Sequence, residues 1–313
     1  MQRPLRGMLV VDFTRYVPGA FATAELRRLG ARVVRVEQPG GDPMRATASG
    51  WHDLLNAGKE SVVCDLPGEV DLARALLASA DVAVESFRPG VAARLGVGPE
   101  DAPESAVYCS ITGFGDGGRH TQRAGHDLNY AGWAGLLEAT APQLPPVQVA
   151  DLAAGALGAV TEILAALVES GRTGRGARIV VSMTHNAHRL ASRAPVLTSG
   201  FACYRMYETS DRRWLTVGAL EPKFFARLCG LIGRPELADV QYDEDQDSLA
   251  SELESAFVQR PLDAWLALFE GEDVCVGPVA TLAEAEAELA GPAPGPAPAL
   301  GEHTAAWRRE LGL

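Results

Sequence analysis

The sequence predicts an α/β protein in which a larger domain, built on a mostly parallel sheet with helices on its faces, precedes a smaller α+β domain. Three observations support this fold class. Short apolar runs alternate with helical patterns through the first half of the chain, a hairpin pattern starts near Cys203, and 313 residues are enough for two domains.

The first half of the chain carries the strands of the expected parallel sheet. "LVVDF" (Leu9–Phe13) has strand propensity, "AFATAELRRLG" is a helical pattern that ends at Gly30, and "RVVRVE" (Arg32–Glu37) is the second strand. The runs "ESVVCDL", "ADVAVESF" and "AVYCSITGF" are expected to be further strands, with the helix "EVDLARALLASA" between two of them. This alternation favours parallel pairing.

A long apolar helix is expected to start at Asp151. In "DLAAGALGAVTEILAALVESG" the large apolar residues recur at helical spacing, and Gly171 follows the end. Asp151 is expected first as an N-cap, a role that does not exclude chemistry at the same carboxylate. "ARIVVSM" then predicts another buried strand.

The second domain is predicted over residues 203–290, after a linker at 187–202. "CYRMYETSDRRWLTVGAL" predicts a hairpin with its turn at Ser210–Arg212. "EPKFFARLCGLIG" and "PLDAWLALFEG" predict helices, and "VCVGPVATL" predicts a strand that leads to the helical "AEAEAELA". A Pro/Gly/Ala linker, "GPAPGPAPALG", precedes a last helix, "EHTAAWRREL". The larger domain is therefore expected to span residues 1–186 and to be completed by 291–313.

Composition limits the classes of function. The net charge of −12 gives no general attraction to nucleic acid or to anionic membranes. We find no apolar run that approaches the length of a membrane span, and Asp12 interrupts the N-terminal run, which favours a strand over a signal peptide. The cysteines are far apart and odd in number, which favours buried thiols in a reducing cytoplasm over disulfides or zinc. They are Cys64, Cys109, Cys203, Cys229 and Cys275.

The stretch "AGHDLNYAG" (Ala124–Gly132) is the first candidate for chemistry. It places His126 beside Asp127, Asn129 and Tyr130 in a predicted loop between apolar elements. Imidazole side chains exchange protons near neutral pH, which suits acid–base catalysis. A structural, hydrogen-bonded histidine is the competing interpretation.

Other polar groups also have two interpretations. Glu221 stands at the start of a predicted helix, where an acid favours the helix dipole. Arg88 and Arg94 follow a strand, where they are either solvated or bind an anion. "GFGDGG" (Gly113–Gly118) lacks the spacing of the dinucleotide fingerprint and is expected to be a turn with unusual backbone angles. No metal-ligand spacing is found.

Taken together, the motifs resemble a known family over almost the whole chain. The order "RVVRVEQPGGDP", "LNAGKESVVCDL", "ADVAVESFRPGVAARLGVG", "AGHDLNYAG", "VADLAAG", "YETSDRRWLTVGALEPKFF" and "DVCVGPVATLAEA" is similar to the family III CoA-transferases (CaiB/BaiF), and within them to the α-methylacyl-CoA racemase branch. The resemblance implies a Rossmann-like large domain, a small domain, and an interlocked, cytoplasmic homodimer. It further implies an acyl-CoA substrate of lipid metabolism and a site shared between the large domain of one chain and the small domain of the other.

The resemblance also implies roles for individual residues. His126 and Asp151 match the two acid/base groups of the racemases, and Glu221 matches the acid that pairs with the histidine. Backbone amides at the helix start near Asp151 are expected to stabilise the enolate. Coenzyme A enters as part of the substrate, and no other cofactor and no metal is required. The residues expected to contact coenzyme A are Arg88, Arg94, Asp127, Tyr130 and Lys59.

Two alternatives stay open. In a family III CoA-transferase, Asp151 would instead be a nucleophile that forms a mixed anhydride and then an enzyme–CoA thioester. A catalytically silent acyl-CoA-binding relative is the third possibility. The sequence also departs from the usual family pattern at three positions that often carry cations, namely Gln38, Ala57 and Glu60. Binding of the adenosine end of coenzyme A is therefore expected to differ from the usual mode.

Overall fold

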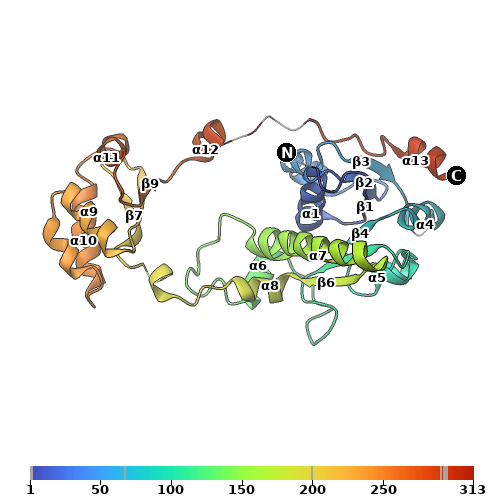
Figure 1. Ribbon diagram of the computed structural model, residues 1–313, viewed down its shortest axis with the longest axis horizontal. Helices are drawn as coiled ribbons and strands as arrows, with labels where there is room; N and C mark the ends of the chain where they lie inside the picture. The colour runs from blue at the N-terminus through green and yellow to red at the C-terminus, as the bar shows by residue number, and fades with distance from the viewer. Residues whose placement is uncertain (1–2, 67, 199, 290, 292–294) are drawn as a thin grey trace. The chain divides into compact units, whose positions relative to one another are not determined.

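A sheet of six parallel strands organises the larger of two units in the computed structural model, which describes residues 3–66, 68–198, 200–289, 291 and 295–313 (Figure 1). The strand order is β3-β2-β1-β4-β5-β6, with parallel register throughout. This is a doubly wound order, and it confirms the predicted α/β class. The strands are β1 (Leu9–Asp12), β2 (Arg32–Glu37), β3 (Glu60–Val63), β4 (Val82–Glu85), β5 (Val107–Thr112) and β6 (Arg178–Ser182).

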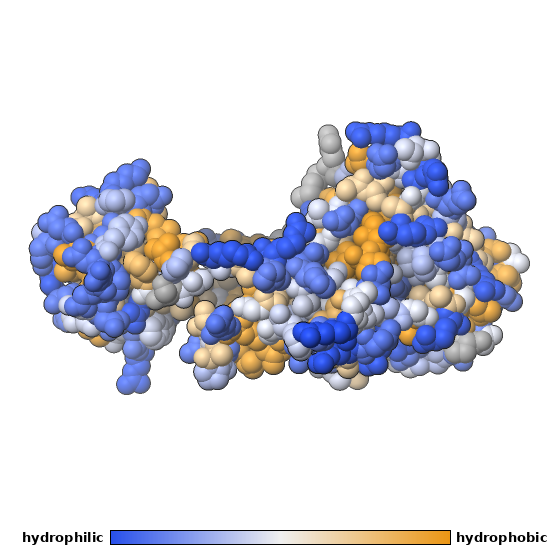
Figure 2. Space-filling model, turned by 90° about the horizontal axis from the view of Figure 1, so that it is seen from below, coloured by the Kyte–Doolittle hydropathy of each residue, from blue (hydrophilic) through white to orange (hydrophobic). Residues whose placement is uncertain are grey.

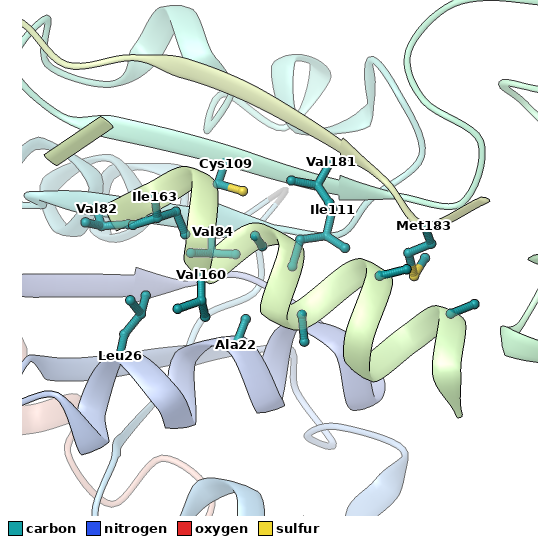
Figure 3. Close-up of a cluster of buried hydrophobic side chains, with 14 of the residues drawn as sticks. Ala22, Leu26, Val82, Val84, Cys109, Ile111, Val160, Ile163, Val181 and Met183 are labelled. Atoms are coloured by element: carbon teal, nitrogen blue, oxygen red, sulfur yellow. The ribbon is translucent and has the colours of Figure 1, made fainter. Parts of the chain in front are cut away.

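Helices cover both faces of this sheet because its strands are apolar on both sides. Alternate residues of β1 enter different clusters: Val10 packs with Leu26 of α1, whereas Val11 packs with Leu76 of α4. Figure 3 shows the first cluster, between α1, α7 and the sheet. The helical segments of this unit are α1 (Tyr16–Arg28), α2 (Met44–Thr47), α3 (Ser49–Asn56), α4 (Val70–Ala78), α5 (Val91–Arg94), η1 (Pro99–Asp101), α6 (Asp127–Trp133), η2 (Ala150–Leu157), α7 (Gly158–Thr173), α8 (Met183–Leu190) and α13 (Thr304–Leu311).

The long helix begins differently from the prediction and ends later. Its first eight residues, η2, are a π-helix, and α7 continues from Gly158 to Thr173. The helix ends at Gly174 and not at Gly171. Gly174 has a φ of 71°, which glycine adopts at little cost. The expected N-cap is also wrong, because Val149 occupies that position and Asp151 lies in the first turn.

This same stretch corrects the expectation that no segment reaches the length of a membrane span. Ala150–Thr173 has a mean hydropathy of 1.7 in its most apolar window and is long enough to cross a membrane, by length and composition alone. In the fold, Ala159, Val160 and Ile163 of this helix are buried in the cluster against α1 and the sheet (Figure 3).

The second unit is a three-stranded antiparallel sheet covered by helices. The hairpin of β7 and β8 turns at the predicted residues, and β9 pairs with β8. Tyr207, Phe257 and Trp265 contribute to its separate core. Both units also present apolar patches to the surface, coloured orange in Figure 2. The elements of this unit are η3 (Pro195–Leu197), β7 (Tyr204–Glu208), β8 (Trp214–Gly218), α9 (Pro222–Leu231), η4 (Pro235–Val240), α10 (Gln246–Phe257), α11 (Leu262–Phe269), β9 (Val276–Pro278) and α12 (Leu282–Leu289).

The chain divides into Met1–Ala191 with Pro294–Leu313, and Ser192–Ala293. The expected linker at 187–202 overlaps α8, which extends to Leu190, and part of the expected Pro/Gly/Ala linker lies outside the described residues. The C-terminal helix α13 belongs to the larger unit, where the Trp307 indole donates to Glu60 at 2.6 Å. Four cysteines are buried as expected, but Cys275 is exposed.

Candidate active site

A cleft of about 510 Å³ opens at the carboxyl ends of β1, β4 and β5. The order of strands along the sheet runs one way from β1 to β3 and the other way from β4 to β6, and ligands of doubly wound proteins bind in the crevice at such a switch point. His126 and Asp151, which come from segments 25 positions apart, line this one cleft together with Tyr16, Arg88 and Tyr130. The fold therefore brings the two predicted acid/base groups into the same space.

The start of α6 positions His126. Its backbone N–H donates to Asn129 Oδ1 at 3.0 Å, and its carbonyl accepts the Asn129 N–H at 2.8 Å, so the asparagine closes the helix end. The imidazole is exposed, and it meets the Tyr16 ring edge-on with 6.1 Å between ring centres. An exposed ring at a helix start is accessible to a substrate in the cleft.

The π-helical turn positions Asp151. Its backbone N–H donates to Asp127 Oδ1 at 2.9 Å, and the Leu152 N–H donates to the Gln148 carbonyl at 2.8 Å. These amides are therefore occupied, which corrects the expectation that they stabilise an enolate. π-Helical turns are rare and often occur at functional sites. The Asp127 side chain therefore stabilises this turn by accepting a hydrogen bond, and it does not line the cleft.

The Asp151 carboxyl is tuned for proton exchange near neutral pH. Burial raises its pKa to about 7, and the neighbouring Asp127 carboxylate contributes in the same direction. A general acid or base works best when its pKa is close to the operating pH. Asp151 can therefore both release and accept a proton under ordinary conditions.

Tyr130 forms part of the cleft wall. Burial raises the pKa of its phenol to about 12, and its hydroxyl donates to the Gly125 carbonyl. A Cβ on Gly113 would lie 2.4 Å from the Tyr130 ring, so the "GFGDGG" segment needs glycine there for close packing. As predicted, that segment is a turn with positive φ angles, at Gly115 and Gly118.

Arginines supply positive charge around the cleft. Arg88 lines it, but Arg94, on α5, is exposed and lies outside it. Sequence analysis missed Arg15 and Arg123, which also line the cleft. Over the described part of the chain, no carboxylate lies within 4.0 Å of Arg15, Arg88 or Arg123. The missing signal was spatial, because these residues follow β1, β4 and β5 at distant points in the sequence.

Lys59 is a structural residue, which corrects its expected contact with coenzyme A. The side chain is buried, and its ammonium donates to the Ala20 carbonyl at 2.8 Å, Thr23 Oγ1 at 2.9 Å and Asn56 Oδ1 at 3.0 Å. An ammonium has three hydrogens, so all of them are used within the chain. Burial lowers its pKa to about 7.

Glu221 lies in the second unit, whereas every residue of the cleft lies in the first. It is exposed at the N-cap of α9, where the structure confirms the predicted helix start. Within the described ranges, no group of three or more His, Cys, Asp or Glu side chains is arranged to hold a metal ion.

Comparisons with known proteins agree on one family. The model of CoA-transferase family III matches residues 5–295. The chain is 33% identical to human succinyl-CoA:glutarate CoA-transferase, over 91% of this chain and 74% of that protein. It is also 33% identical to human alpha-methylacyl-CoA racemase, over 90% of this chain and 78% of that protein. The crystal structure of a CaiB/BaiF family protein from Brucella suis matches with a TM-score of 0.84 and 27% identity, covering 99% of this chain and 100% of that one.

Proposed function

The chain belongs to CoA-transferase family III, and from that membership we propose that it is an isomerase that inverts the α-carbon of a 2-methylacyl-CoA thioester. The family includes both racemases and CoA-transferases that act on acyl-CoA substrates. The observation that carries the proposal is that His126 and Asp151 line the same cleft while the pKa of Asp151 is raised to about 7.

The reaction needs two groups that exchange roles. One takes the α-hydrogen as a proton, and the electron pair of the C–H bond moves into the enolate of the thioester. The other gives a proton to the opposite face of the α-carbon, and the enolate collapses to the inverted thioester. A carboxyl group with a pKa of about 7 can start in either protonation state, and the His126 imidazole lines the same cleft as its counterpart.

The rest of the cleft supports this chemistry. Arg15, Arg88 and Arg123 carry positive charge that suits the phosphates of coenzyme A. No cofactor beyond the CoA group of the substrate takes part in the proposed reaction.

Two further parts of the proposal rest on the family resemblance alone. We take the protein to be a cytoplasmic homodimer, and Glu221 to support the protonated form of His126. Light scattering measures the oligomeric state. Glu221→Gln is expected to slow α-proton exchange while the second unit keeps its fold, because Glu221 is exposed and makes no side-chain cap at α9.

CoA transfer is the second candidate. It is favoured by the transferase relatives and by the place of Asp151 in the wall of the cleft, where a nucleophile would need to stand. A nucleophilic carboxylate works only when ionised, however, and a pKa of about 7 leaves Asp151 partly protonated at neutral pH. This protonation favours acid–base chemistry.

Deuterium exchange separates the candidates. Purified protein is incubated in D₂O with one enantiomer of a 2-methylacyl-CoA and no acceptor acid, and deuterium at C2 is followed by NMR. Uptake with loss of chirality is expected, and His126→Ala or Asp151→Ala should abolish the loss of chirality. No uptake, with labelled CoA moving to an added free acid, would instead identify a transferase. Thermal stabilisation by the thioester with neither reaction would identify a binding protein.

A further inference from the structure

Tyr16 holds an unusual backbone conformation at the edge of the cleft. Its φ is +64°, in the left-handed region that bulky side chains rarely adopt. Two other non-glycine residues in the described ranges, Arg212 and Cys275, share this feature, but both belong to the second unit. Strained residues persist where the surrounding structure fixes them, and they cluster at functional sites.

Three separate elements fix this conformation. The consecutive backbone N–H groups of residues 14–16 donate to three different side chains: Thr14 to Asp12 Oδ1 at 2.9 Å, Arg15 to Ser86 Oγ at 3.1 Å, and Tyr16 to Asp42 Oδ2 at 3.0 Å. These acceptors come from β1, from the end of β4 and from the loop after β2. The backbone that enters α1 is therefore held at three consecutive residues.

The strain places an aromatic ring against the imidazole of His126. The Tyr16 side chain is 45% exposed, lines the cleft and meets the His126 ring edge-on at 6.1 Å. This is the favoured arrangement of two aromatic rings. The Tyr16 ring is therefore a direct aromatic neighbour of the imidazole.

We propose that Tyr16 is a positioning residue, whose ring holds the His126 imidazole in the orientation used for proton transfer. The inference rests on the proposed function for its kinetic consequence, but its geometric content does not depend on turnover. A half-exposed ring buries little apolar surface and so adds little to the stability of the fold. The strained backbone is therefore explained by the position that it gives the ring in the cleft.

Two substitutions separate the ring from the backbone. Tyr16→Gly removes the ring and relieves the strain, because glycine adopts positive φ readily. We expect kcat for α-proton exchange to fall at least about tenfold, with KM changed by less than about threefold. A misplaced catalytic group slows the chemical step but has little effect on substrate binding. Tyr16→Phe keeps the ring and should rescue most of the lost kcat. A Tyr16→Gly variant with wild-type kcat, or an equal loss in Tyr16→Phe, would overturn the proposal.

Arg212→Gly is the matched control for strain. Arg212 has a φ of 61° in the hairpin turn between β7 and β8, outside the cleft. Both glycine variants are expected to keep or raise the melting temperature, but Arg212→Gly should leave kcat unchanged. A fall in kcat for Arg212→Gly equal to that for Tyr16→Gly would show a general effect of the substitution and overturn the assignment to Tyr16.

NMR tests the geometry without turnover. In protein labelled at histidine, with the His126 signal assigned through His126→Gln, the His126 ring proton should shift in Tyr16→Gly and return to its wild-type position in Tyr16→Phe. An unshifted signal in Tyr16→Gly would contradict the ring contact itself. A shifted signal in a protein without exchange activity would support the contact while rejecting the proposed function.

Discussion

Two charged regions lie at the same carboxyl edge of the six-stranded sheet, and they differ in how their polar groups are used. At the ends of β1 and β2, Arg35 is 2% exposed and donates to Asn56 Oδ1 at 2.8 Å and to Asp42. Lys59 is equally enclosed, 3.8 Å from Asp12. In this region the charged groups bind each other.

In the cleft at β1, β4 and β5, the charged groups remain open. His126 is exposed, Asp151 titrates near neutral pH, and Arg88 has no carboxylate within 4.0 Å among the described residues. Buried charges that pair with one another hold a fold in one conformation, whereas charges left open are available to a substrate. The buried region therefore contributes to stability, and the open region is the candidate site for substrate.

The same substitution in both regions gives the largest expected contrast. Arg35→Met leaves Asp42 buried without its cation, so we expect a loss of about 3–5 kcal/mol in the free energy of unfolding. Arg88→Met, in the open region, should leave stability within about 0.5 kcal/mol. Urea denaturation of the two variants measures both values, and equal losses would remove the distinction between the regions.

Asp151→Asn should reduce activity and raise stability. Racemisation is expected to fall by at least about 10²–10⁴. Because the folded-state pKa of Asp151 is raised from 3.8 to about 7, the folded state binds more protons than the unfolded state between these values. The free energy of unfolding therefore falls as the pH rises from 3.8 to about 7. The total fall is at most about 4 kcal/mol.

The measurement is the melting temperature of Asp151→Asn and of the unaltered protein at pH 5 and pH 8. The rise in melting temperature of the variant over the unaltered protein should be larger at pH 8, where the buried carboxylate of the unaltered protein is charged. A gain that is equal at both pH values would show that Asp151 is not held with a raised pKa.

Asp127→Asn sharpens the account of the cleft. The amide oxygen can still accept the Asp151 N–H, but the negative charge is lost. The pKa of Asp151 should fall, although only in part, because burial is the larger cause of the shift. The pH–rate profile of exchange should move its Asp151 limb to lower pH. If the Asp151 limb of the pH–rate profile does not move, the charge of Asp127 has no effect on the pKa of Asp151, and Asp127 acts only through its hydrogen bond.

The arginines give the smallest effect. Arg88 lines the cleft and Arg94 does not, although both follow β4 in the sequence. Arg88→Met is expected to raise KM for the thioester about two- to fivefold, as for the loss of one exposed charge pair, and Arg94→Met should leave it unchanged. Steady-state kinetics at matched ionic strength measures KM for the two variants. A larger rise in KM for Arg94→Met than for Arg88→Met would show that the thioester binds outside this cleft.

Sequence reasoning succeeded where local pattern is decisive. "RVVRVE" became β2 with the predicted bounds, and the Ser210–Arg212 turn formed its hairpin, because apolar periodicity and turn residues act over a few positions. His126 and Asp151 were also identified as candidates before their shared cleft was known.

What the sequence did not indicate depends on tertiary contacts. Nothing local shows that Lys59 finds acceptors on α1 and α3, so a contact with coenzyme A was expected. The π-helical turn at Asp151 depends on Asp127 in another helix. Tyr16 carries no glycine or asparagine signal for positive φ, because its conformation is fixed by side chains from three other elements. The short helices α2 and α3 and the longer α10 were not predicted either.

Stereospecific exchange in single variants tests the two-base account most directly. His126→Gln and Asp151→Asn are each incubated in D₂O with the separate (2R) and (2S) thioesters, and deuterium at C2 is measured. If the two groups stand on opposite faces of the α-carbon, neither variant racemises, and each retains exchange with the enantiomer that the other has lost. Exchange of the same enantiomer by both variants, or racemisation by Asp151→Asn at the wild-type rate, would contradict the account.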